Sequence, residues 1–274
     1  MSKKILFNGC SMTAGDAVTW DNYYPDVDFI LHTHLKQPHP KYSLMEIHEM
    51  YWNYITNLRP LDNLSGQVHK LTGYDCTDLS EDGNSNQNIA MTTISFLSQL
   101  SPEERKNYHV CVGWSALARK TCWNSKEKNF YNISPLTVRA NGFEYFHNYI
   151  KEGLINLSNI DHVTDYFSNI VLLQSYLKAN NITYTFWNTL AYVELPWVNA
   201  LNNFNKHKKI IPYKHELLFD NQDWIAFRGS KQPWLDDIWS ANSTKIISKD
   251  NLHPNLEEVI KLANQITEKI NNIN

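Results

Sequence analysis

The sequence lacks several features that would each identify a class of protein. It has only four cysteines in 274 residues, and no two are spaced as Cys-x-x-Cys, so neither a disulfide framework nor a structural zinc site is expected. No apolar run approaches the ~20 residues that a membrane helix needs, and residues 1–4 lead into a strand rather than a signal-peptide core. A formal net charge of -3 gives no basic field for nucleic acid or an anionic membrane. We therefore expect a cytosolic protein that binds neither.

Recognisable cofactor motifs are absent too. The chain has no Gly-x-x-x-x-Gly-Lys-Ser/Thr sequence and no Gly-x-Gly-x-x-Gly after a strand, so a phosphate-cradling loop is not predicted. His32, His34 and His39 lie close in sequence, but no cluster of carboxylates accompanies them, and we assign no metal. The expected ligand is a small or neutral molecule, with no cofactor.

Asparagine is abundant, and lysine greatly outnumbers arginine. This composition is typical of AT-rich coding, which suggests a phage or an AT-rich bacterium as the source. A phage-encoded protein could also be associated with the virion.

Alternating strand and helix patterns predict the fold class. Buried strands are expected at residues 4–7, 74–79, 108–113 and 182–187, and helices with apolar residues at helical spacing at 85–100, 162–179 and 256–270. This order predicts an α/β fold with a doubly wound parallel sheet. We predict one domain over residues 1–274, with long insertions at about 20–63, 115–160 and 189–249.

The first segment that could carry out catalysis is residues 6–16, Leu-Phe-Asn-Gly-Cys-Ser-Met-Thr-Ala-Gly-Asp. It places Ser11 at the carboxyl end of a strand, where open α/β sheets bind their ligands. Near the other end of the chain, Asp250 and His253 are three residues apart, so one turn can present an imidazole base and the carboxylate that orients it. The three residues together predict a Ser/His/Asp triad. The alternatives are a helix N-cap for Ser11 and a surface histidine for His253.

These segments resemble the sequence blocks of the SGNH (GDSL-type) hydrolases. Residues 9–15, Gly-Cys-Ser-Met-Thr-Ala-Gly, are similar to the first block, Gly-Asp-Ser-x-Thr-x-Gly, with Cys10 replacing the acidic residue. Residues 250–254, Asp-Asn-Leu-His-Pro, match the last block, Asp-x-x-His-Pro. Residues 83–86, Gly-Asn-Ser-Asn, look like the second block, and residues 112–115, Val-Gly-Trp-Ser, stand where Gly-x-Asn-Asp is expected. The resemblance implies a flavodoxin-like sheet and a serine esterase.

The resemblance also implies an oxyanion hole built from the backbone N–H groups of Ser11 and Gly83, with Asn86 or Ser115 as a third donor. Ser115 stands where the family has a side-chain amide, and loss of one donor costs about 2.7 to 4 kcal/mol, or ~10² to 10³ in rate. Trp114 either stacks on a sugar or belongs to the core. Arg119 either contacts the substrate or is a solvated loop residue.

The leading prediction is a serine esterase that acts on an acylated small molecule or an O-acylated carbohydrate. Four tryptophans in the third insertion favour a carbohydrate, because aromatic faces pack on sugars, although packing of a long loop explains them equally well: Trp197, Trp224, Trp234 and Trp239. Two other functions stay open. An acyltransferase would pass the acyl group to a sugar hydroxyl if the insertions exclude water. A binding or structural protein without catalysis would agree with Ser115 and Cys10.

Overall fold

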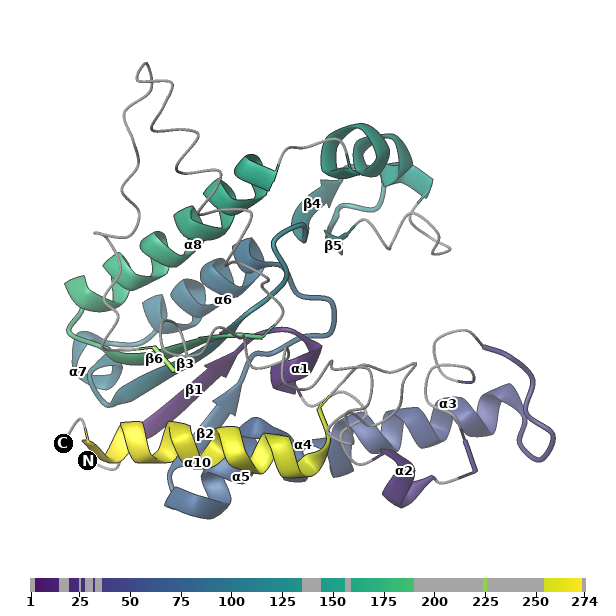
Figure 1. Cartoon of the computed structure of the whole chain (residues 1–274), viewed down its shortest axis with the longest axis horizontal. Coiled ribbons are helices and arrows are strands. Elements are labelled where there is room, and N and C mark those ends of the chain that lie inside the picture. The colour runs from purple at the N-terminus through teal and green to yellow at the C-terminus, as the bar shows by residue number, and fades with distance from the viewer. Residues whose placement is uncertain are drawn as a thin grey trace.

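The core of the protein is a four-stranded parallel sheet with the order β2-β1-β3-β6 (Figure 1). The strands are β1 (Lys4–Asn8), β2 (Asp75–Asp78), β3 (Tyr108–Trp114) and β6 (Thr183–Asn188). This computed structural model describes residues 3–14, 20–24, 26, 27, 32, 36–134, 144–155, 159–189, 224, 225 and 254–272. Helices cover both faces of the sheet, which confirms the predicted α/β fold with a doubly wound parallel sheet.

The two central strands are more completely buried than the edge strand β2. All seven residues of β3 are buried, as expected for a central parallel strand with helices on both faces. Its neighbour β1 is buried from Ile5 onward. At the edge, β2 is only partly buried, and its two aspartates make that edge polar.

Two helical layers enclose the sheet. On one face lie α6 (Asn86–Ser98) and α8 (Asn159–Ala179), and on the other lie α5 (Leu64–Thr72) and α10 (Leu256–Asn272) (Figure 1). Because side chains alternate along a strand, Leu6, Val110 and Val112 pack in the first core. Ile5, Phe7 and Cys111 pack in the second. None of the helices in the described ranges is long and apolar enough to span a membrane.

Residues 44–58 form the helix α3 (Leu44–Asn53), which continues into a π-helical turn, η2 (Tyr54–Leu58). It belongs to the first insertion, which projects beyond the carboxyl end of the sheet (Figure 1) and has its own apolar cluster: Trp20, Val27, Ile47 and Tyr54. The remaining short helices are α1 (Ser11–Ala14), α2 (Trp20–Tyr23), α4 (Arg59–Asp62), α7 (Pro102–Arg105), η4 (Glu144–Phe146) and η5 (Tyr149–Ile155).

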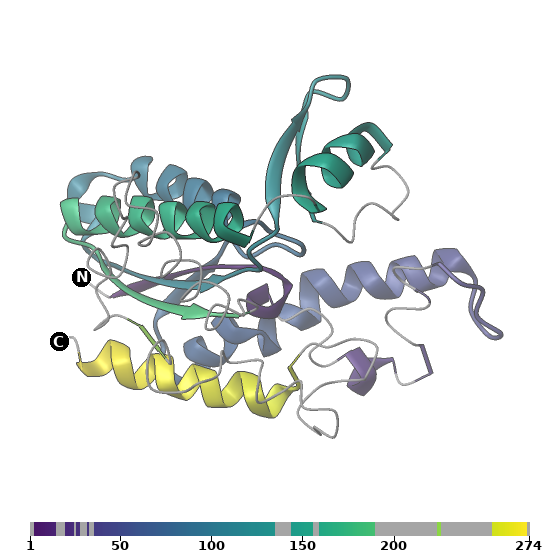
Figure 2. The same cartoon turned by 45° about the horizontal axis from the view of Figure 1, so that its top comes forward.

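The second insertion contains a β-hairpin that the sequence analysis did not predict. It consists of β4 (Lys120–Asn124) and β5 (Asn129–Ile133), paired antiparallel, and it stands away from the main sheet (Figure 2). One side of the hairpin packs on η4 and η5 through a small apolar cluster: Cys122, Tyr131, Ile133, Phe146 and Ile150. Of the third insertion, only residues 189, 224 and 225 are described, so the insertion boundaries stay predictions.

Candidate functional site

Ser11 lies at the topological switch point of the sheet. From β1 the chain crosses first to β2 on one side and then to β3 on the other, and ligands of open α/β sheets bind at the carboxyl ends of strands where such a reversal occurs. Ser11 is the first residue of α1, two residues after Gly9. The carbonyl of Cys10 accepts hydrogen bonds from the N–H groups of Thr13 and Ala14, both 2.9 Å long. Cys10 therefore occupies the cap position, and Ser11 is the first residue inside the helix.

Two glycines allow α1 to lie tightly against the ends of β1 and β3. A Cβ atom at Gly9 would come within 2.2 Å of Thr13 Oγ1, and one at Gly113 within 2.3 Å of the same atom. A Cβ at Gly113 would also approach Thr189 Cγ2 at 2.8 Å. The Thr13 side chain thus fills the space between the two glycines and fixes the turn that presents Ser11.

Cys10, which replaces the acidic residue of the resembling motif, points into the protein. It is fully buried, and its Sγ lies 3.5 Å from Thr189 Oγ1. Thr189 in turn donates a hydrogen bond of 2.6 Å to the carbonyl of Trp114. Cys10 therefore helps to connect the turn after β1 with the end of β3.

The loop with Gly83 is hydrogen-bonded to the same turn. The carbonyl of Gly9 accepts a hydrogen bond from Asn84 Nδ2 at 3.1 Å and one from the N–H of Glu81 at 3.2 Å. Gly83 has φ of +73°, which glycine adopts without strain, and no atom lies within 4 Å of the position where its Cβ would be. The structure thus places a sterically open Gly83 on a loop attached to the residue two before Ser11.

Asn86, Ser115 and Arg119 come together in one hydrogen-bonded network. Asn86 Oδ1 accepts a hydrogen bond from the N–H of Ser115 at 2.7 Å, and its Nδ2 donates to the carbonyls of Ser115 and Ala116 at 3.2 and 3.1 Å. Ser115 Oγ accepts a hydrogen bond of 2.9 Å from Arg119 Nη1. The amide of Asn86 is therefore engaged with the backbone of the loop after β3, and Arg119 is anchored to that loop.

Trp114 packs in the interior of the protein. Its side chain is fully buried, and its ring meets those of Phe186 and Tyr166 edge-on at centroid distances of 5.4 and 6.3 Å. Trp224, one of the tryptophans of the third insertion, also meets Phe186 edge-on at 5.6 Å. This packing favours a core role for both rings over stacking on a sugar.

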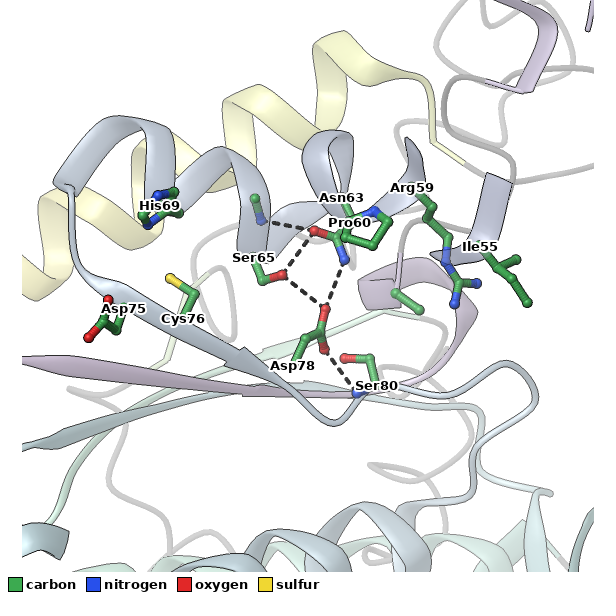
Figure 3. Close-up of a pocket in the computed structure, with 12 residues that line it drawn as sticks. Ile55, Arg59, Pro60, Asn63, Ser65, His69, Asp75, Cys76, Asp78 and Ser80 are labelled. Atoms are coloured by element: carbon green, nitrogen blue, oxygen red, sulfur yellow. Dashed lines mark hydrogen bonds between the residues drawn. The ribbon is translucent and has the colours of Figure 1, made fainter. Parts of the chain in front are cut away.

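A polar pocket that the sequence analysis missed adjoins α1 (Figure 3). It has a volume of about 470 Å³ and lies between Ala14, the start of α5 and β2. The carboxylate of Asp78 points into it and accepts hydrogen bonds from Asn63 Nδ2 at 2.9 Å, Ser65 Oγ at 3.0 Å and the N–H of Ser80 at 2.9 Å. Burial raises the pKa of Asp78. The sequence feature that could have indicated this pocket is the polar strand Asp-Cys-Thr-Asp, which has its last residue at the carboxyl end of the sheet.

Asp250 and His253 lie outside the described residues. The described chain resumes at Pro254, and α10 begins at Leu256. Figure 1 shows that α10 begins at the same end of the sheet as α1, the carboxyl end of the strands, and runs back toward their amino ends. Within the described ranges, no group of three His, Cys, Asp or Glu side chains gathers to hold a metal ion.

The contact with Arg119 leads to a prediction for Ser115. We expect Ser115→Ala to lower the free energy of unfolding by about 1.5 to 3 kcal/mol, because a hydrogen bond to a charged group is lost. We expect kcat for a model ester to stay nearly unchanged. Urea denaturation and steady-state kinetics of the variant would measure both. A ~10²-fold loss of kcat at constant KM would instead place the hydroxyl in the oxyanion hole.

Comparison with known proteins gives structural likeness only. No family model and no curated protein matches the sequence. The psychrotrophic esterase EstA from Pseudoalteromonas sp., in a crystal structure inhibited by monoethylphosphonate, is similar with a TM-score of 0.43 and 12% identity over 99% of this chain and 98% of that one. An acetyl xylan esterase, Est2A, from the rumen bacterium Butyrivibrio proteoclasticus has a TM-score of 0.44 and 11% identity over 99% of this chain and 64% of that one. At these values neither likeness assigns a function.

Proposed function

We propose that this protein is a serine ester hydrolase in which Ser11 is the nucleophile, His253 the general base and Asp250 the residue that orients the imidazole. The observation that carries the proposal is the place of Ser11. It begins α1 at the switch point of a parallel sheet, on a turn that Thr13 fixes between two glycines. The start of α10 on the same side of the sheet supports His253 as its partner (Figure 1).

The reaction follows from these roles. Ser11 Oγ attacks the acyl carbonyl while His253 accepts its proton, and Asp250 holds the tautomer and stabilises the imidazolium. The tetrahedral oxyanion would accept hydrogen bonds from the N–H groups of Ser11 and Gly83. When the intermediate collapses, the alcohol leaves with the proton from His253. Water then attacks the acyl-enzyme in the same way and releases the acid.

The loop after β3 supports a hole with two donors. The side-chain amide of Asn86 donates hydrogen bonds to the backbone carbonyls of residues 115 and 116, and Ser115 accepts a hydrogen bond from Arg119. A hole that lacks one donor loses ~10² to 10³ in rate. We infer a slow esterase rather than an inactive protein.

For the substrate, we propose an acylated small molecule or an O-acylated carbohydrate. The pocket beside α1 has a polar lining that includes Asn63, Asp78 and Ser80, and a polar lining favours an alcohol that carries hydroxyl groups.

Covalent labelling tests the proposal directly. A fluorophosphonate should phosphonylate Ser11 Oγ with loss of fluoride, so that intact-mass spectrometry shows one adduct on the wild-type protein and none on Ser11→Ala. Ser98→Ala is the matched control, because Ser98 is an exposed serine on α6, and it should label like the wild type. Equal labelling of Ser11→Ala would assign the nucleophile elsewhere. A wild-type protein that takes up no reagent would favour a binding protein without catalysis.

A further inference from the structure

The β4–β5 hairpin carries two exposed aromatic side chains on one face. Trp123 and Phe130 are cross-strand partners, and their ring centroids are 4.9 Å apart. Both rings are largely open to solvent, with exposed fractions of 49% for Trp123 and 64% for Phe130. This exposed aromatic pair on a projecting element is a candidate binding surface.

The same face of the hairpin is hydrogen-bonded to the loop that contains Asn84 and Ser85. Side chains alternate along a strand, so Thr121 and Asn132, which are also cross-strand partners, share the face with the aromatic pair. Thr121 donates to Asn132 Oδ1 at 2.8 Å and accepts a hydrogen bond from Ser85. Asn132 Nδ2 lies 3.4 Å from Asn84 Oδ1. Since Asn84 donates to the carbonyl of Gly9, a continuous polar path joins the hairpin to the nucleophile turn.

The aromatic pair lies farther along the hairpin than the two side chains at the end of this path. Trp123 and Phe130 are the next cross-strand pair on this face after Thr121 and Asn132. The two pairs are two residues, or ~7 Å, apart along each strand. The hairpin extends away from the main sheet (Figure 2). A chain-like substrate that reacts at Ser11 and follows the hairpin would therefore reach the aromatic pair with its distal part.

The chemistry of the face favours a neutral sugar chain. Its four side chains are Thr121, Trp123, Phe130 and Asn132, and none of them carries a charge. Aromatic faces pack on the C–H faces of sugar rings, while hydroxyl and amide groups bind sugar hydroxyls. A charged peptide or a nucleic acid would find no ionic partner among these four.

We propose that the Trp123–Phe130 pair is a distal subsite that stacks on a ring of a neutral oligosaccharide whose acyl ester lies at Ser11. This inference rests on the proposed esterase function and narrows its substrate to an ester on a sugar chain, longer than the single sugar that reacts. The pocket beside α1 lies on the opposite face of the sheet, with α5, so the two sites would contact different parts of the substrate.

Binding can be measured without turnover. Isothermal titration of the Ser11→Ala protein with cellohexaose, xylohexaose and mannohexaose should show saturable binding for at least one hexasaccharide and none for the matching monosaccharide. Adding Trp123→Ala should weaken that binding ~10-fold or more, and Trp123→Phe should restore most of it. Trp52→Ala is the matched control, because Trp52 is 51% exposed on α3, and its loss should leave binding unchanged.

Three results would overturn the subsite. They are no binding of any hexasaccharide, equal binding with and without Trp123, or a change from dimer to monomer on sedimentation of Trp123→Ala, which would make the face an interface between copies. Hydrolysis of p-nitrophenyl acetate by the wild-type protein keeps the two proposals apart, because this short ester does not extend to the aromatic pair. Hydrolysis without hexasaccharide binding refutes only the subsite. Trp123-dependent binding without any hydrolysis by the wild type refutes only the esterase.

Discussion

Replacing Ser11 with alanine is expected to lower kcat for a short acyl ester such as p-nitrophenyl acetate by ~10⁴ to 10⁶-fold. The variant lacks the only atom that forms the acyl bond in the proposed mechanism. The fold should survive, because Ser11 is the first residue of a four-residue helix, and the turn is held by the contacts of Thr13 and Asn84 rather than by the hydroxyl.

Steady-state kinetics and thermal denaturation of Ser11→Ala, with Ser98→Ala as the control, would measure the two expectations. Both proteins should melt at nearly the same temperature, while only Ser11→Ala loses activity. A loss of less than tenfold in Ser11→Ala would show that another group carries out the chemistry.

Acidification is expected to destabilise the protein through His109, a buried residue of β3. Its Nδ1 and Nε2 each lie 2.9 Å from a threonine hydroxyl, that of Thr183 and that of Thr185. Burial, with smaller contributions from the charges of Lys3 and Lys269, lowers the pKa of His109 to about 3. In the unfolded chain the pKa is about 6.5. Between these values the unfolded state binds a proton that the folded state excludes, so the free energy of unfolding should fall by about 1.4 kcal/mol for each pH unit below 6.5.

Urea denaturation at pH 7, 6, 5 and 4 would measure this loss, with His109→Gln as a comparator that cannot take up the proton. Asp78 acts in the opposite direction, since its raised pKa lets the folded state bind a proton more tightly. The two proteins share Asp78, so the difference between their curves isolates His109. Parallel curves would contradict the prediction.

The core of the fold could be predicted from the sequence because its signals are local. Apart from His109, the strand at 108–113 is largely apolar, and the helices at 85–100 and 256–270 repeat apolar residues on one side, so each pattern reflects its own burial. The β4–β5 hairpin escaped prediction because its strands mix amide, hydroxyl, thiol and aromatic side chains. Within the described residues, its inner side packs on the short helices η4 and η5, which follow later in the chain.

The candidate site likewise has features that local sequence predicts and features that depend on distant residues. The place of Ser11 could be predicted, because a strand that ends in Gly-Cys-Ser defines it locally. The hydrogen bonds of Asn86 could not be predicted, because its partners are backbone groups 29 and 30 residues away. The pocket around Asp78 likewise depends on the docking of α5 against β2, and the burial of Trp114 depends on Tyr166 and Phe186 from two later elements.

Asn8, the last residue of β1, has a consequence for the order of folding. Its fully buried amide donates to the carbonyl of Ile89 and to the hydroxyls of Thr92 and Thr93 on α6, while its Oδ1 accepts the N–H of Gly9. These partners on α6 are more than 80 residues away in sequence, so the chain must close a long loop, at a cost in entropy, before they can meet. Until α6 docks, the end of β1 that leads into the turn of Ser11 lacks these three partners. Undocking of α6 would therefore also release the strand end that leads to Ser11, and we expect the two changes to occur in one cooperative opening.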